Sequence, residues 1–194
     1  HIAAATPALM IALAIFVIGF VTLLFTKIEE PEQAPVDISL VKGAMKYRHF
    51  VLGVIAIFLY MGVEVGTPTY ILQYLTSPEM GMDASIVGLI VAVYWLMMLV
   101  GRFVGGAIGS KVSSRAMITT VSAATLVLVA FGMFAPTSIT VNVPGIDWAN
   151  LNLIWAEVPV GIFAFLLVGR CTSVMWGGIF NMAVEGLGKY TAIA

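Results

Sequence analysis

The sequence predicts an all-α membrane protein with about five membrane-spanning helices. Apolar residues make up 61% of the 194 positions and charged residues only 10%, whereas soluble domains have about 45–50% and roughly 25%. The mean hydropathy of +1.06 agrees with this composition. The apolar residues also gather in five long runs with almost no charge. We therefore expect most side chains to face lipid rather than a water-excluding soluble core.

Each apolar run is long enough to cross a bilayer as a helix, which takes about 20 residues. The runs cover residues 2–26, 50–75, 84–109, 116–135 and 158–184. Strands of a membrane barrel are only about ten residues long and alternate in polarity, so these continuous runs favour helices. Gly186 and Gly188 follow the last run and are expected to end its helix.

Polar connectors separate the runs, and their basic residues predict the orientation. The connectors on one side of the predicted membrane and the C-terminal tail contain Lys27, Lys42, Lys46, Arg48, Lys111, Arg115 and Lys189. The connectors on the other side, 76–83 and 136–157, contain no Lys or Arg. Because cytoplasmic loops are enriched in basic residues, loops 27–49 and 110–115 are predicted to be cytoplasmic. Interfacial aromatic anchors are expected at Trp148 and Trp155 outside and at Tyr47 and Tyr190 inside.

Composition also argues against several classes of function. A net charge of −1 offers no basic face for nucleic acid. Cys171 is the single cysteine, and His1 and His49 are far apart, so we expect no disulfide framework, no metal site and no cofactor. The apolar runs contain no histidine and no paired carboxylates, so an intramembrane enzyme is not expected. No filter-like sequence or ring of charges favours a channel.

The ends of the sequence suggest a piece of a longer protein. The chain begins at His1 without a basic leader and stops a few residues after Lys189. No signal peptide is recognisable. We therefore expect an internal fragment whose remaining part would complete the molecule.

Glu64 is the only charge in the second run and lies near the middle of the predicted membrane. A lone carboxylate there costs a few kcal/mol, so it should face a cavity or a partner. Tyr60 and Thr67 share its helical face, and Tyr70 and Gln73 lie beside it. This mixture of groups suits hydrogen bonds to a polyol. The alternative is a structural polar contact between helices.

Arg170 is the only charge in the fifth run, again at mid-depth. On a continuous helix it would share a face with Ser173, Gly177 and Asn181. One hypothesis is that Arg170 and Glu64 approach each other across a cavity as an ion pair. The alternative is that the Arg170 side chain extends to the membrane surface.

Two tryptophans within the runs, Trp95 and Trp176, are candidates to stack on the apolar face of a sugar ring. Tryptophans in membrane helices also pack against neighbouring helices or face lipid. Both roles remain open for each of them.

The third run ends in a glycine-rich basic stretch, residues 101–115. Gly101, Gly105 and Gly109 repeat every four residues and predict a helix face that a neighbouring helix can approach closely. Arg102 is the only charge within the run. On its own, it can be interpreted, with Lys111 and Arg115, as an ordinary member of the basic cytoplasmic set.

Three tracts resemble a known family. Residues 106–115, GAIGSKVSSR, are similar to the major facilitator superfamily signature, roughly G-x-x-x-D-R-x-G-R-R, which Gly106, Lys111 and Arg115 match. Ser110 stands where Asp is usual and Ser113 where Gly is usual. Residues 58–65, FLYMGVEV, and 173–191, SVMWGGIFNMAVEGLGKYT, resemble helices seven and ten of the fucose/glucose–galactose:proton symporter branch.

The resemblance implies that the chain contributes five helices, six to ten, of a twelve-helix transporter. Residues 1–26 would be helix six at the end of the first half, 27–49 the cytoplasmic linker between halves, and 50–194 a truncated second half with helices seven to ten. Helices seven and ten would line the central cavity, with Glu64 and Asn181 on the substrate path. The missing first half would be a partner of this chain and would contain the main proton-carrying acids.

The implied function is secondary active transport of a hexose or deoxyhexose, such as fucose, glucose or galactose, by alternating access with proton symport. The expected location is a plasma membrane, in bacteria the inner membrane. The alternative is a transporter of the same superfamily for an organic anion or drug, because Arg170 could bind a carboxylate. The expected substrate-binding residues are Tyr60, Glu64, Tyr70, Gln73, Trp95, Arg170, Trp176 and Asn181. The expected gating motif is Arg102, Gly106, Lys111 and Arg115. The expected partners are the sugar, the proton and the lipid bilayer, with no nucleic acid.

Overall fold

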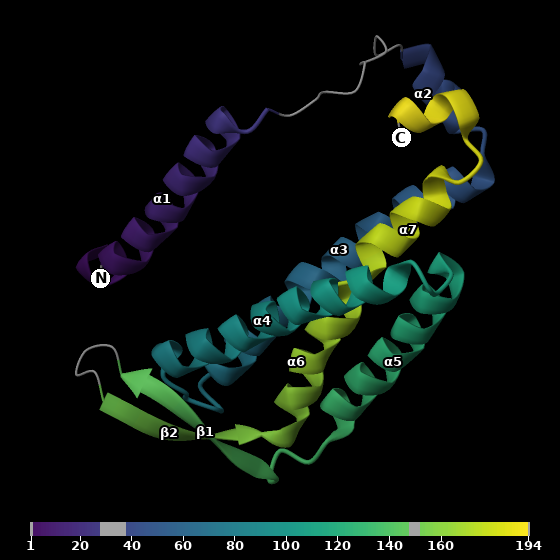
Figure 1. Cartoon of the computed structure of the whole chain (residues 1–194). Coiled ribbons are helices and arrows are strands. Elements are labelled where there is room, and N and C mark those ends of the chain that lie inside the picture. The colour runs from purple at the N-terminus through teal and green to yellow at the C-terminus, as the bar shows by residue number, and fades with distance from the viewer. Residues whose placement is uncertain (1, 28–37, 148–151, 194) are drawn as a thin grey trace. The chain divides into compact units, whose positions relative to one another are not determined.

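A computed structural model of the chain describes residues 2–27, 38–147 and 152–193, and Figure 1 shows its elements. The first helix, α1 (Ile2–Phe25), belongs to a compact unit of residues 1–36, and the rest of the chain forms a second unit. The apolar side chains of Leu9–Phe25 are exposed along the whole of that stretch. An apolar helix without a protein cover of its own suits a lipid environment.

Four helices of the second unit are long and apolar enough to cross a membrane. They are α3 (Arg48–Leu75), α4 (Ala84–Gly109), α5 (Ser114–Phe134), and the pair α6 (Val160–Thr172) and α7 (Met175–Val184), which together span Val160–Val184. These four predicted spans are confirmed, with ends within two residues of those expected. The first predicted run, residues 2–26, forms α1, whose apolar stretch Leu9–Phe25 is shorter than the other four.

Local signals explain where several helices begin and end. The Asp83 side chain accepts a hydrogen bond from the Ser85 backbone N–H at 2.8 Å and caps α4. The Ser113 side chain caps α5 in the same way, accepting from Ala116 N–H at 3.3 Å. After α7, Gly186 has φ +77°, a left-handed conformation that ends a helix, as the sequence predicts. Two short elements, α2 (Ile38–Ala44) and the 3₁₀ helix Gly188–Ile193, lie in the polar segments that begin and end the sequence of the second unit.

The helices of the second unit pack against one another around a buried apolar cluster. Helix α6 packs against α4 and α5, and α3 packs against α7 (Figure 1). Tyr94, Ile71, Leu75 and Val87 are among the largest fully buried side chains of the cluster. Many large apolar side chains on the outside of α3, α4 and α5 are exposed. Surfaces of this kind are too apolar for water, so the chain is a multi-pass membrane protein.

A two-stranded antiparallel hairpin replaces most of the loop expected at 136–157. It consists of β1 (Thr140–Asp147) and β2 (Asn152–Pro159), and it delays the start of the following helix to Val160. Gly145 lies against α4, because an added Cβ there would be 3.1 Å from Ile86 Cγ1. In β2 the partly buried Ile154 and Ala156 alternate with the exposed Leu153, Trp155 and Glu157, which is the pattern of a strand with one covered face.

The predicted interfacial aromatic residues lie at opposite ends of the second unit. Trp155 is exposed on the hairpin. The rings of Tyr47, at the start of α3, and Tyr190, beyond α7, are 6.0 Å apart. Trp148 lies outside the described residues. The described aromatics thus occupy positions that suit the two predicted interfaces.

The last predicted span is not one continuous helix. It is interrupted by a turn at Ser173 and Val174, between α6 and α7. The Ser173 hydroxyl donates a 2.6 Å hydrogen bond to the Arg170 carbonyl, a local bond of the kind that competes with regular helix. Ser173 and Val174 both keep right-handed helical backbone angles, so the interruption is a local one between two helical segments.

The turn lies against the glycine face of α4, which confirms close helix approach at two of the three predicted positions. A Cβ added at Gly101 would meet Ser173 Oγ and would be 2.6 Å from the Arg170 carbonyl oxygen. A Cβ at Gly105 would meet Val174. Gly109 has no such neighbour within 4 Å among the described residues. Small residues thus allow α4 to approach the α6–α7 junction.

We predict that Gly101→Ala destabilises the full-length protein by about 1–3 kcal/mol, because the Arg170 backbone cannot move aside as a side chain could. Thermal unfolding in detergent measures the effect. The matched control is Gly88→Ala on the same helix, where no neighbouring atom is within 4 Å and little change is expected. Equal melting temperatures for the two variants would contradict the proposed close packing.

Candidate functional site

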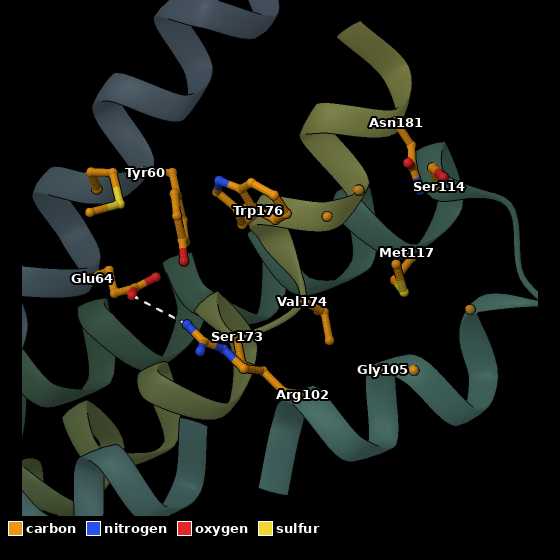
Figure 2. A pocket seen from close by; sticks show the side chains of 15 residues that line it. Tyr60, Glu64, Arg102, Gly105, Ser114, Met117, Ser173, Val174, Trp176 and Asn181 are labelled. Carbon is orange, nitrogen blue, oxygen red and sulfur yellow. Dashed lines mark ion pairs between the residues drawn. The ribbon is translucent and has the colours of Figure 1, made fainter. Parts of the chain in front are cut away.

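A cavity of about 700 Å³ lies among α3, α4, α5 and α7 (Figure 2). This size is in the range of small-molecule sites, about 300–1,000 Å³. Its polar and aromatic lining comes from α3 and α4, from the first turn of α5, and from α7. The main contributors are Tyr60, Glu64, Arg102, Ser114, Trp176 and Asn181.

An ion pair joins two of these helices at the cavity. Arg102 Nη2 lies 3.6 Å from Glu64 Oε1, drawn as the dashed line in Figure 2. Long side chains on a helix lean toward its N-terminus. Accordingly, Arg102 reaches back along α4, and the same Nη2 lies 3.6 Å from Met98 Sδ. This direction moves the positive charge from the end of α4 toward the middle of the span, where Glu64 lies.

The two partners differ in their exposure. Glu64 is only 8% exposed, whereas the Arg102 side chain is 58% exposed and opens to the cavity. The second carboxylate oxygen, Glu64 Oε2, is buried and has no hydrogen-bond partner within the described structure. Buried polar atoms are normally satisfied, so this oxygen is an unused acceptor on a residue that lines the cavity.

An aromatic surface forms another wall. Trp176 is 50% exposed, and its ring stacks on Phe180 with centroids 5.4 Å apart and planes 3° from parallel. Asn181, on the same helix, adds an amide that can both donate and accept hydrogen bonds. The cavity thus combines a flat apolar face with charged and neutral hydrogen-bonding groups.

The structure brings together only part of the predicted substrate-binding set. Tyr60, Glu64, Trp176 and Asn181 line the cavity, as expected for one site. The other four predicted residues, Tyr70, Gln73, Trp95 and Arg170, are not among its lining residues.

Two of these other residues have aromatic neighbours of their own. Tyr70 stacks on Tyr74 and contacts Phe165, beside a second hollow of about 230 Å³. Trp95 lies edge-on to the buried Tyr94, and about half of its surface is exposed. Gln73 is exposed on α3. These positions depend on how α3 and α4 are rotated about their own axes relative to the neighbouring helices. Residue spacing along a single helix cannot predict that rotation.

The hypothesis that Glu64 pairs with Arg170 is wrong in this structure, because the partner of Glu64 is Arg102. Arg170 is on α6. Its backbone carbonyl faces Gly101 of α4, and its side chain is exposed. The expected common face of Arg170 and Asn181 assumed one continuous helix. Ser173, Gly177 and Asn181 of that expected face line the cavity together, whereas Arg170 does not.

Arg102 is the residue whose role the sequence reasoning missed. It was expected only as a member of the basic gating motif. The available signal was that the second and third runs each contain one charge, of opposite sign, and are joined by a short connector. Of the other motif residues, Gly106 lines the cavity, while Lys111 and Arg115 are exposed around the connection from α4 to α5.

Comparison with known proteins gives sugar transporters as relatives. The chain is 29% identical over 188 residues to a protein named glucose/galactose transporter from Brucella abortus biovar 1 (strain 9-941), covering 96% of this chain and 40% of that protein. It is 26% identical over 153 residues to a putative glucose/galactose transporter from Helicobacter pylori (strain J99), covering 79% of this chain and 32% of that protein. The predicted resemblance to this group of sugar transporters is thereby confirmed.

The same comparisons also mark the extent of the similarity. The chain spans at most about two fifths of the length of these relatives. No protein-family model matches it, and no solved structure matches it.

We predict that Glu64 and Arg102 are energetically coupled in the full-length protein. Arg102→Gln leaves a buried carboxylate without its partner, so it should destabilise more when Glu64 is present than in the Glu64→Gln background. The expected coupling is about 1 kcal/mol, because Arg102 is partly exposed. Thermal unfolding of the single and double variants measures it.

Arg170→Gln is the matched control, because it also neutralises an arginine in a membrane span. It should show no coupling with Glu64→Gln. A larger coupling of Glu64 with Arg170 than with Arg102 would refute the observed pairing.

Proposed function

We propose that the full-length protein is a secondary active transporter of a neutral hexose or deoxyhexose, such as glucose, galactose or fucose. The observation that carries the proposal is the cavity itself, in which the Glu64–Arg102 pair faces the exposed ring of Trp176 between membrane-length helices. The similarity over 96% of the chain to a protein named glucose/galactose transporter supports it.

The lining groups suit the chemistry of a sugar. Hydroxyl groups of the sugar donate hydrogen bonds to Glu64 Oε2 and accept them from the Arg102 guanidinium. The Asn181 amide can donate or accept such a bond. The apolar C–H face of the ring stacks on Trp176. Because Glu64 and Arg102 balance each other's charge, the site favours a neutral ligand. This balance argues against an organic anion as the substrate.

Transport then follows from alternating access. The chain spans 40% of the length of the glucose/galactose transporter from Brucella abortus. The remaining part of the full-length protein would supply the opposite wall of the cavity, and rocking of the two parts would expose the sugar to one side at a time. The basic Lys111 and Arg115 support a cytoplasmic position for the α4–α5 connection, which in bacteria would be the inside of the inner membrane.

Coupling to a proton gradient is part of the proposal. The resemblance to proton symporters supports it, and the missing first half would contribute acidic residues to the coupling. A sugar is neutral, so an accompanying ion is required if the membrane potential and ion gradient are to drive accumulation.

We predict that Trp176→Ala raises the KM for labelled glucose or galactose by about tenfold, or about 1.4 kcal/mol of lost stacking and contact. Uptake by cells expressing the full-length protein measures KM. The matched control is Trp155→Ala on the exposed hairpin, which should leave KM near the wild-type value. Equal effects of the two substitutions would argue against Trp176 as a sugar platform.

We also predict that an inside-alkaline pH gradient drives accumulation of galactose in vesicles containing the full-length protein. A sodium gradient of the same size should not. Excess benzoate or another organic anion should fail to compete with the sugar. Accumulation driven only by sodium would refute proton symport, and strong competition by the anion would favour the organic-anion alternative.

A further inference from the structure

The turn of α3 that holds Glu64 lacks one of its own backbone hydrogen bonds. Pro68 lies inside α3 and is buried. Proline has no backbone N–H, so the carbonyl of the residue four positions earlier, Glu64, has no donor within the helix. In a membrane, a freed backbone carbonyl must be satisfied by a neighbouring helix or side chain.

The carbonyl groups on either side are satisfied from α3 itself. The Thr67 hydroxyl donates to Val63 O at 2.8 Å, and the Thr69 hydroxyl donates to Val65 O at 2.8 Å. The Glu64 carbonyl between them receives its bond from another helix, because the Tyr94 hydroxyl of α4 donates to it at 2.9 Å. This bond is buried and joins residues 30 positions apart.

Tyr94 is held firmly in place. It is 0% exposed, and Gly169 of α6 packs directly on it. A Cβ added at Gly169 would be 2.9 Å from both the Tyr94 ring and the Tyr94 carbonyl oxygen. The ring is therefore packed against α6, while its hydroxyl bridges α4 to α3.

Helix α4 contacts Glu64 twice from one face. Tyr94, Met98 and Arg102 follow one another at intervals of four residues and so lie along the same side of α4. Tyr94 binds the Glu64 backbone, and Arg102 binds the Glu64 carboxylate. The two contacts together fix both the position of this turn and the direction of its side chain.

We propose that Tyr94 is a positioning residue that supplies the hydrogen bond removed by Pro68, so that the Glu64 carboxylate meets Arg102 and faces the cavity. Tyr94 does not line the cavity and acts through Glu64. The effect on transport rests on the proposed sugar-transport function. The hydrogen-bond relation between Tyr94 and Pro68 does not.

The test is a double-mutant cycle in the full-length protein with Tyr94→Phe, Pro68→Ala and both together. Tyr94→Phe keeps the ring and removes only the hydroxyl. Pro68→Ala gives α3 back the N–H that can bind the Glu64 carbonyl. Thermal unfolding in detergent and the KM and Vmax of glucose or galactose uptake are measured for each variant.

With Pro68 present, Tyr94→Phe should raise KM by about tenfold, with a smaller change in Vmax, because it displaces a sugar-binding group. It should also lower the melting temperature. In the Pro68→Ala background the same Tyr94→Phe change should alter KM by less than about twofold and leave the melting temperature nearly unchanged. A role of Tyr94 in ring packing alone would not produce this dependence on Pro68.

Thr69→Val is the matched control. It also removes a hydroxyl that donates to an α3 carbonyl, but Val65 O keeps the backbone donor of residue 69. Its KM and melting temperature should stay close to the wild-type values. If Pro68→Ala prevents folding, the comparison of Tyr94→Phe with Thr69→Val decides, and equal small effects overturn the proposal.

Two further outcomes separate the role of Tyr94 from the proposed transport function. Equal effects of Tyr94→Phe with and without Pro68 overturn the role assigned to Tyr94, even if sugar uptake is normal in the wild type. If the wild-type protein takes up no sugar, the proposed function fails, whereas the melting temperatures of the cycle still decide whether Tyr94 replaces the missing bond.

Discussion

The arrangement of the second unit depends on keeping the Glu64 carboxylate at membrane depth. A carboxylate in that position requires a compensating charge or contact with water. The structure provides the charge, since Arg102 approaches one oxygen, and it places Glu64 in the lining of the cavity. The pair also links α3 to α4, so the same contact that compensates the charge sets how these helices meet.

Close packing on the other side of α4 completes the site. Gly101 and Gly105 let the α6–α7 junction approach α4, and α7 begins at Met175, directly after the turn at Ser173 and Val174. Trp176, in the first turn of α7, lines the cavity together with the ion pair. One face of α4 thus contributes the charge of Arg102 to the cavity. A neighbouring strip of the same helix, with Gly101 and Gly105, has no side chains and lets the α6–α7 junction pack closely.

Sequence alone predicted the membrane spans well, because the length of an apolar run is set by the thickness of the bilayer. It also identified Glu64 and the glycine face, since a charge in lipid and a four-residue glycine repeat are local signals. It missed the partner of Glu64 and the break in the last span. Pairing depends on the rotation of two helices, and no proline marks the turn at Ser173. The hairpin was missed because Pro144 and Gly145 within β1 are typical of a loop.

The proposed function requires the Glu64–Arg102 cavity to be a wet, sugar-binding space inside the membrane. This can be tested by the rate at which a hydrophilic thiol reagent modifies Asn181→Cys in an otherwise cysteine-free full-length protein, with and without galactose. We expect modification that galactose slows, while a Phe103→Cys control on the exposed apolar side of α4 reacts slowly and is unaffected by the sugar. Failure of Asn181→Cys to react, or reaction at a rate that galactose does not change, would show that the cavity is not such a space.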